Sequence, residues 1–198
     1  MSPFTIRPAT TAASDPQLLV DFQDSQISWL SSMGSGGQWG TQSVRNDPAR
    51  SAKTRGWVTL SERNAPWNGG SAEWCRAYVA EASDGTPVAG LVLDNHAPAY
   101  VRSVLPEQDE RDPFVYLAYV ISDRNVPQGK GSGAALIAFA KEQTRDAGVK
   151  RLCLDCWRGN DGKLVRYYES QGFVVVGSYD VPVPEKEDWL GCVLEIRL

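Results

Sequence analysis

The sequence predicts one domain of the mixed α/β class, and three observations support this prediction. The chain has 198 residues, of which 42% are hydrophobic, a length and composition suited to a single globular core. Two segments with the apolar spacing of helices lie in the first third of the chain. From residue 73 onward, apolar residues instead form the short runs of strands, with one strand–helix–strand crossover in the second half. We therefore expect a mostly antiparallel sheet with flanking helices.

The N-terminal third begins with an alternating strand at 4–7, followed by a helix that starts at 14–16, where Pro16 suits the first turn. The Gly/Ser-rich segment 31–40 follows, and its composition is typical of a flexible connector. Trp39 is unusual in such a connector and favours a binding loop instead. A second helix is expected at about 44–62.

The strands expected next are 74–80 and 88–93, joined by the Asp84-Gly85 hairpin turn. The almost continuous apolar run at 114–121 is typical of a strand that is covered on both faces. The remaining expected elements are a helix at 134–147, a strand at 151–157, a short helix at 164–170, and strands at 173–176 and 192–196.

Charge and hydropathy exclude several classes of function. The net charge is −4 and the pI is near 5.1, so we expect no basic surface for nucleic acid. No apolar run approaches the roughly 20 residues of a membrane span. The N-terminal residues lack the apolar core of a signal peptide, so the expected compartment is the cytoplasm.

The four cysteines lie in strand-like segments, which predicts buried, reduced thiols. Cys153 and Cys156 have C-x-x-C spacing, but the chain has no second pair and only one histidine. We therefore expect no metal site.

The glycine-rich turn before the helix at 134–147 is the most informative segment. Glycines ahead of a helix expose backbone N–H groups at its positive end, which suits a phosphate. An ordinary helix start after a mobile loop is the simpler interpretation. The expected phosphate-binding residues are Gln128, Gly129, Lys130, Gly131, Ser132, Gly133 and Ala134.

Two phosphate-binding motifs fit this turn poorly. A P-loop fails because Arg124 occupies its first glycine position. A dinucleotide fingerprint, G-x-G-x-x-A, begins at Gly129, and Asp155 on the following strand has the place of a ribose-binding acid. Pro127 and its neighbours separate this turn from the preceding strand, so a dinucleotide-binding protein remains a remote alternative.

A third motif, Q/R-x-x-G-x-G/A, is matched without exception from Gln128 to Gly133. A second segment, which begins at Tyr168, reads Y-x-x-x-G-F. With these two motifs the chain resembles the GNAT superfamily of N-acetyltransferases, in element order over its whole length and most strongly at 114–173.

The resemblance implies one acetyltransferase domain at 1–198, in which 1–72 shape the acceptor side and 73–198 form the sheet and the acetyl-CoA-binding half. It implies that the parallel strands 114–121 and 151–157 splay apart around acetyl-CoA. The glycine turn would hold the pyrophosphate. Main-chain groups of Val120 and Ser122 would pair with the pantetheine, and Asn160 would contact it.

For catalysis, the resemblance places Tyr168 where the family tyrosine protonates the CoA thiolate; a core aromatic is the alternative, and Tyr167 is the reserve. The strand before the turn lacks the glutamate that many members use as a base. Asp155 is therefore the candidate base, although a hydrogen-bonded acid at a strand end would look the same. His96 lies in a loop and is expected at the surface.

The expected reaction is direct acetyl transfer to the amine of a small molecule, with Trp39 and Tyr116 as substrate contacts. The acidic segments 107–112 and 185–188 favour a cationic acceptor. The alternatives are a protein or peptide N-acetyltransferase and a non-catalytic acetyl-CoA sensor. A homodimer is compatible with each of these functions.

Overall fold

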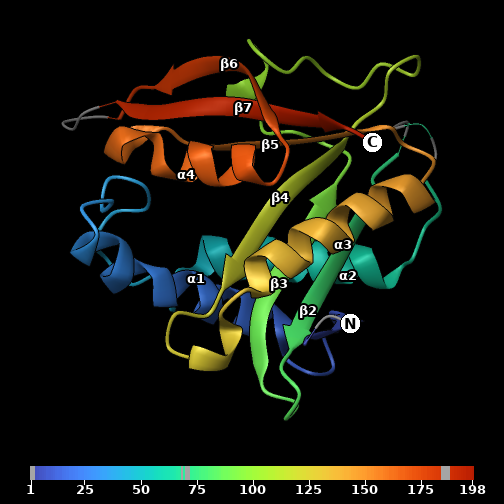
Figure 1. Ribbon diagram of the computed structural model, residues 1–198. Helices are drawn as coiled ribbons and strands as arrows, with labels where there is room; N and C mark the ends of the chain where they lie inside the picture. Colours follow the sequence, from blue (N-terminus) through green and yellow to red (C-terminus); the bar gives the residue numbers. More distant parts are fainter. Residues whose placement is uncertain (1–2, 68, 70–71, 184–187) are drawn as a thin grey trace.

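The fold is built on one twisted seven-stranded sheet with the order β1-β2-β3-β4-β5-β7-β6 (Figure 1). The computed structural model describes residues 3–67, 69, 72–183 and 188–198. The strands are β1 (Thr5–Pro8), β2 (Cys75–Glu81), β3 (Pro87–Asp94), β4 (Val115–Ser122), β5 (Arg151–Trp157), β6 (Val174–Val181) and β7 (Trp189–Arg197). The helices are α1 (Asp15–Ser32), α2 (Pro48–Glu62), α3 (Ser132–Asp146) and α4 (Gly159–Ser170), with short 3₁₀ turns η1 (Ala99–Val101) and η2 (Pro127–Gly129).

Strands β4 and β5 form the parallel pair of this otherwise antiparallel sheet. They pair only at Val115 with Leu152 and at Tyr116 with Cys153. Beyond Tyr116, β4 runs on to Ser122 while β5 diverges from it. The expected mixed α/β fold with a splayed parallel pair is therefore confirmed. This sheet also rules out the dinucleotide-binding alternative, which requires a mostly parallel sheet.

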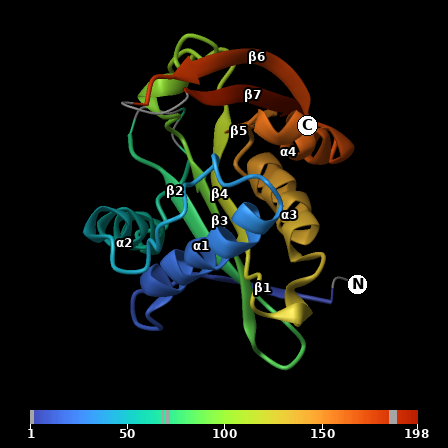
Figure 2. The same cartoon turned by 90° about the vertical axis from the view of Figure 1, so that its left-hand side faces the viewer.

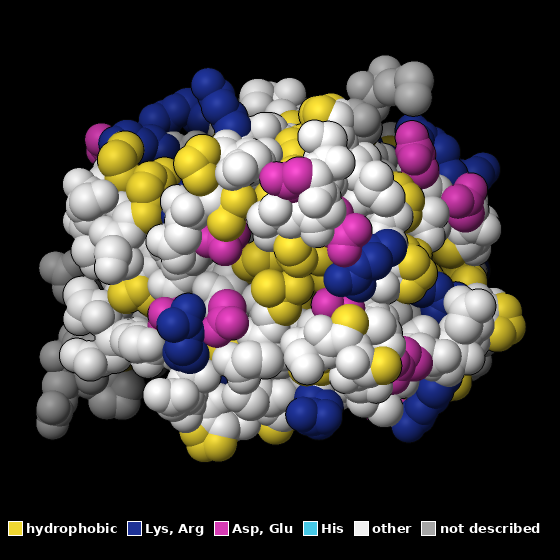
Figure 3. Space-filling model, turned by 90° about the horizontal axis from the view of Figure 1, so that it is seen from below, with side chains coloured by type: hydrophobic (Ala, Val, Ile, Leu, Met, Phe, Trp, Pro, Cys, Tyr) yellow, Lys and Arg dark blue, Asp and Glu magenta, His cyan; other side chains and the backbone are white. Residues whose placement is uncertain are grey.

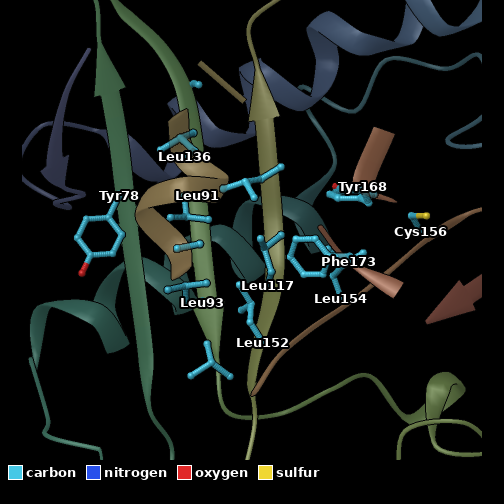
Figure 4. Packing of buried hydrophobic residues seen from close by; sticks show 14 of the residues in the cluster. Tyr78, Leu91, Leu93, Leu117, Leu136, Leu152, Leu154, Cys156, Tyr168 and Phe173 are labelled. Carbon is cyan, nitrogen blue, oxygen red and sulfur yellow. The ribbon is translucent and has the colours of Figure 1, made fainter. Parts of the chain in front are cut away.

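Helices cover both faces of the sheet. Figure 2 shows α1 and α2 on one side and α3 and α4 on the other. Leu19 and Phe22 of α1 pack in the first layer, whereas Leu136 of α3 and Tyr168 of α4 pack in the second (Figure 4). Burial on both faces explains the continuous apolar run of β4, because each fully buried large side chain contributes about 1.5–3 kcal/mol.

Close packing of α1 against β3 depends on Gly90. A Cβ atom at this position would lie 2.3 Å from Cδ2 of Leu19. The Oη of Tyr119 on β4 also donates a hydrogen bond to the carbonyl of Leu19, at 2.6 Å. These two contacts fix α1 across the sheet, directly beside the splayed strands.

The start of α2 differs from the sequence prediction, whereas the start of the regular part of α4 agrees with it. Helix α2 begins at Pro48 and not near 44, because Asp47 caps it by accepting hydrogen bonds from the N–H groups of Ala49 and Arg50. In α4, residues 160–162 have positive φ angles and the regular helix follows them, in agreement with the expected start at 164.

The four cysteines are free and buried, as expected. Among the described residues, no group of three His, Cys, Asp or Glu side chains is arranged to hold a metal ion. None of the described helices is both long enough and apolar enough to cross a membrane. Figure 3 shows basic and acidic side chains interspersed on one face of the molecule, around hydrophobic ones.

Candidate active site

A cavity of about 800 Å³ lies where β4 and β5 separate. Its walls come from both sides of the sheet, including α1, α2, α4 and the loop 31–40. The residues expected from the sequence that line it are Val120, Ser122, Gly133, Asn160, Tyr168, Asp155 and Trp39. The fold thus brings candidate cofactor, catalytic and substrate residues from distant segments into one chamber.

The glycine turn presents a row of free N–H groups at the start of α3. The first hydrogen bond of the helix runs from the N–H of Ala135 to the carbonyl of Gly131. Among the described residues, the N–H groups of 131–134 therefore have no acceptor. The N–H groups of Gly129 and Lys130 are instead used inside η2, where they donate to Val126 and Pro127.

Side chains hold this turn against the end of β4. The buried Oγ of Ser132 lies 2.7 Å from the carbonyl oxygen of Gly129 and 2.7 Å from Oγ of Ser122. Gly131 has a φ of +90°, and no atom lies within 4 Å of where its Cβ would be. At Gly133 a Cβ would lie 3.2 Å from Oη of Tyr167. The backbone is therefore open to a ligand at Gly131 and closely packed at Gly133, while Gln128 and Lys130 are exposed.

Asp155, at the cavity end of β5, is the central titratable group. Tyr116 of β4 donates its hydroxyl to Oδ1, and Tyr179 of β6 donates to Oδ2. Burial raises the pKa of Asp155, while the two hydrogen bonds and the charge of Lys53 lower it. Burial also raises the pKa values of both tyrosines, so they remain protonated donors. Asp155 is thus a hydrogen-bonded acid that also faces the cavity.

Tyr116 holds Asp155 and does not form part of the cavity wall itself. Its side chain is 2% exposed, and it is absent from the residues that line the cavity. The expected substrate contact is therefore indirect, through Asp155. The sequence analysis did not identify Tyr179, because its contact depends on the way strands β5, β7 and β6 lie side by side.

Tyr168 belongs both to the core and to the cavity wall. It packs edge-on against Phe173 with ring centroids 6.0 Å apart, and it is buried in the main core (Figure 4). It also lines the cavity. Burial raises the pKa of its hydroxyl, so the phenol keeps its proton. Tyr167 is more exposed and lines the same cavity.

The Gly/Ser-rich loop 31–40 is held by contacts from three elements. Asn160 of α4 donates to the carbonyl of Met33 at 3.0 Å and to Oγ of Ser35 at 2.6 Å. Nε1 of Trp189, in β7, donates to the carbonyl of Gln38 at 3.0 Å. A Cβ at Gly37 would touch the ring of Trp157 on β5. The loop is therefore a docked wall of the cavity, and the amide of Asn160 is used to hold it.

Trp39, near the end of this loop, packs between the loop and α1. It packs partly buried against a small cluster of Val20, Ile27 and Val44, and it also lines the cavity. Its ring thus closes the chamber on the α1 side.

The part of the cavity around Asp155 includes residues that the sequence analysis missed. These are Arg50, Lys53 and Trp57 from α2, Tyr100 from η1 and Trp189 from β7. No periodicity or motif marks them, because α2 is brought over the sheet only by tertiary packing.

The acidic segments do not reach this site in the described structure. Glu107 pairs with Arg102 at 2.9 Å, and Asp112 pairs with Arg197 at 2.8 Å. Neither carboxylate is among the residues that line the cavity. Of 185–188, residues 185–187 lie outside the described residues. His96 is exposed beside Asp94 and also lies away from the cavity.

The comparisons with known proteins agree with this architecture. The model of the acetyltransferase (GNAT) family matches residues 43–173. A search of curated proteins finds no match. Several solved structures share the fold at low sequence identity.

One is a GNAT superfamily phosphinothricin acetyltransferase from Sinorhizobium meliloti in complex with acetyl-CoA, with a TM-score of 0.65, 11% identity, and coverage of 100% of this chain and 89% of that chain. A GNAT family acetyltransferase from Listeria monocytogenes has a TM-score of 0.65 and 19% identity, covering 98% and 95%. A ribosomal-protein-alanine N-acetyltransferase from Brucella melitensis has a TM-score of 0.64 and 21% identity, covering 98% and 99%.

Proposed function

Because the chain belongs to the acetyltransferase (GNAT) family, and so uses acetyl-CoA as its acetyl donor, we propose that it transfers the acetyl group directly to the amine of a small molecule. The observation that carries this proposal is the position of Asp155. The half-buried carboxylate of Asp155, held by two tyrosine hydroxyls, faces the cavity that lies between the splayed strands. A volume of about 800 Å³ is typical of small-molecule sites.

The cofactor half of the proposal rests on the glycine turn and on β4. The four free N–H groups of 131–134, at the positive end of α3, would hold the pyrophosphate. Gly129 contributes by shaping η2, because its own N–H is already used. Beyond Tyr116, the side of β4 toward β5 has no partner strand, so the main chain near Val120 would pair with the pantetheine arm.

A register shift in β4 adds to this surface. Val92 pairs with Tyr119 and Leu93 with Leu117, which leaves Ala118 without a partner on β3. Such a bulge re-aims the backbone locally. Ala118 lines the cavity, so its peptide group is a candidate to contact the acetyl carbonyl.

Asp155 and Tyr168 have complementary roles in the proposed reaction. An alkylammonium has a pKa of about 10, so the bound amine first gives a proton to Asp155, whose raised pKa improves it as a base. The amine nitrogen then attacks the acetyl carbon, the C–N bond forms and the C–S bond breaks. Tyr168 donates its proton to the departing thiolate, and the proton that the nitrogen loses as the amide forms restores the Tyr168 phenol. Asp155 and Tyr168 both line the cavity.

The docked loop 31–40 favours a small molecule over a protein as the acceptor. It covers the cavity through contacts with Asn160 and Trp189, and a peptide chain would need more open access. The presence of both a base and an acid candidate favours an enzyme over a sensor.

Thiol release from acetyl-CoA, measured against a panel of amines and peptides, tests the proposal. We expect release that depends on a small amine and that yields the N-acetylated product by mass spectrometry. Binding of acetyl-CoA by calorimetry without any release would support a sensor. Release with peptides alone would support a protein acetyltransferase.

A further inference from the structure

Lys53 of α2 is a positive charge that lines the cavity without an anionic partner. Its Nζ lies 4.8 Å from the centre of the Trp57 ring. No carboxylate of the described residues lies within ion-pair distance of this ammonium group. Burial lowers the pKa of Lys53, and the positive charge of Arg50 lowers it further. The protein thus places a cation that forms no ion pair in the wall of the chamber.

The neighbouring arginines differ from Lys53 in this respect. Arg50, one turn earlier on α2, lies 3.6 Å from Asp47. Arg124 stacks 3.8 Å from the centre of the Trp29 ring and donates to Gln26. Lys163 also lines the cavity, but Lys53, beside the Trp57 ring, is the lysine whose charge acts on Asp155.

Lys53 and Asp155 place opposite charges in one chamber without forming an ion pair. Their charges influence each other, but the carboxylate is held by tyrosine hydroxyls. If Lys53 served only to neutralise Asp155, a direct contact would be expected. Both side chains instead line one cavity, where a single ligand can contact both.

Resting on the proposed function, we infer that the acceptor is a zwitterion of the amino-acid type, whose amine lies at Asp155 and whose carboxylate or similar anionic group is bound by Lys53. An acceptor that carries both charges would place its ammonium beside Asp155 and its anion beside Lys53, so that both charges of the cavity wall are compensated. Trp57 and Tyr100 line the same region and would pack against an apolar or aromatic body.

Matched pairs of acceptors test this inference. We compare phenylalanine with phenethylamine and tryptophan with tryptamine, which differ only by the carboxylate. We expect kcat/KM to be at least about 10-fold higher for each amino acid, because an ion-paired hydrogen bond contributes about 1.5–3 kcal/mol. Lys53→Gln should remove most of this preference by raising KM for the amino acid, whereas Lys53→Arg should retain it. Arg55→Gln makes the same charge change at a position of α2 that does not line the cavity, and it should change neither.

A binding measurement makes the test independent of turnover. Phenylacetate is titrated by calorimetry into the protein saturated with CoA. We expect binding to the wild type, at least about 10-fold weaker binding to Lys53→Gln, and no change in Arg55→Gln.

Equal kcat/KM for both members of each pair, or phenylacetate binding that Lys53→Gln does not weaken, would overturn the inference. Failure of the proposed function has a different signature: phenylacetate binds through Lys53, yet no amine of any class releases thiol.

Discussion

The hydroxyl of Tyr179 lies 2.5 Å from Oδ2 of Asp155, although the two residues belong to β6 and β5 and strand β7 runs between them. The crossing is possible because Tyr179 is paired in register with Gly191 of β7. A Cβ at Gly191 would lie 2.3 Å from Cζ of Tyr179. A glycine in the middle of a strand thus opens the path for a ring that fixes the candidate base.

Tyr179→Phe should shift the pH dependence of the reaction. The hydrogen bond from Tyr179 lowers the pKa of Asp155 against the larger effect of burial, so its removal raises that pKa. Because Asp155 must be ionised to accept a proton, the acidic limb of kcat/KM should move to higher pH. Tyr78→Phe removes a hydroxyl that bonds Gln143 elsewhere, and it should leave the profile in place. If the pH profile of Tyr179→Phe overlays that of the wild type, Asp155 is not the general base.

Asp155→Asn should lower activity without lowering stability. We expect kcat to fall by at least about 10²-fold, within the range of general base catalysis. The pKa of Asp155 is raised in the folded state, so its contribution to stability is present below its unfolded pKa of about 3.9 and is lost as pH rises through the folded value. The amide carries no charge to desolvate. Thermal unfolding at neutral pH should therefore show a melting temperature equal to or above that of the wild type; a clear decrease would argue against this view of Asp155.

Tyr168→Phe removes the candidate general acid and retains the ring that packs against Phe173. We expect kcat to fall about 10²-fold, with acetyl-CoA affinity and melting temperature nearly unchanged. Steady-state kinetics and calorimetry measure both quantities. If turnover is instead lost in Tyr167→Phe and kept in Tyr168→Phe, the proton comes from Tyr167.

Gly131→Glu tests the phosphate site at the start of α3. The new carboxylate would repel a pyrophosphate at the free N–H groups, so calorimetry should show acetyl-CoA binding at least about 10-fold weaker. Gly85→Glu is the matched control, because Gly85 also has a positive φ, +82°, and open space around its Cβ position. Both variants carry the same backbone strain, and loss of affinity in both would attribute the effect to strain.

Trp39→Ala should affect the acceptor and not the donor. Removal of the ring opens the wall that loop 31–40 forms, so KM for a good acceptor should rise several-fold while acetyl-CoA affinity stays constant. Unchanged acceptor kinetics with a lowered melting temperature would make Trp39 a purely structural residue.

The sequence alone was enough to identify the features that depend on residues close together in the chain. The glycine turn and the segment from Tyr168 to Phe173 are contiguous motifs, and Asp155 could be found from its place at a strand end. Tyr179 and Lys53 could not be found in this way. The first depends on the register of β6 with β7, and the second on the docking of α2 over the sheet.

Asn160 shows a further limit. The family asparagine lies seven residues before the tyrosine, a spacing that Asp161 has in this chain, and Asn160, one residue away, was expected to contact the pantetheine. The positive φ angles at 160–162 break the helix there, and its amide holds Met33 and Ser35 of the loop instead. A change in backbone conformation over three residues was enough to alter what a motif position contacts.

Strands β4 and β5 pair at only two positions, so the stability of the fold depends in part on its ligand. The sheet is in effect two smaller sheets, β1–β4 and β5–β7, joined by little main-chain hydrogen bonding. In the proposed binding mode, an acetyl-CoA molecule in this gap would make contacts with the native state that the unfolded chain does not offer. At a concentration 100 times the Kd, such binding adds about 2.7 kcal/mol to the free energy of unfolding. Resistance to proteolysis would then follow the supply of the acetyl donor, and starved cells would degrade this protein faster than fed ones.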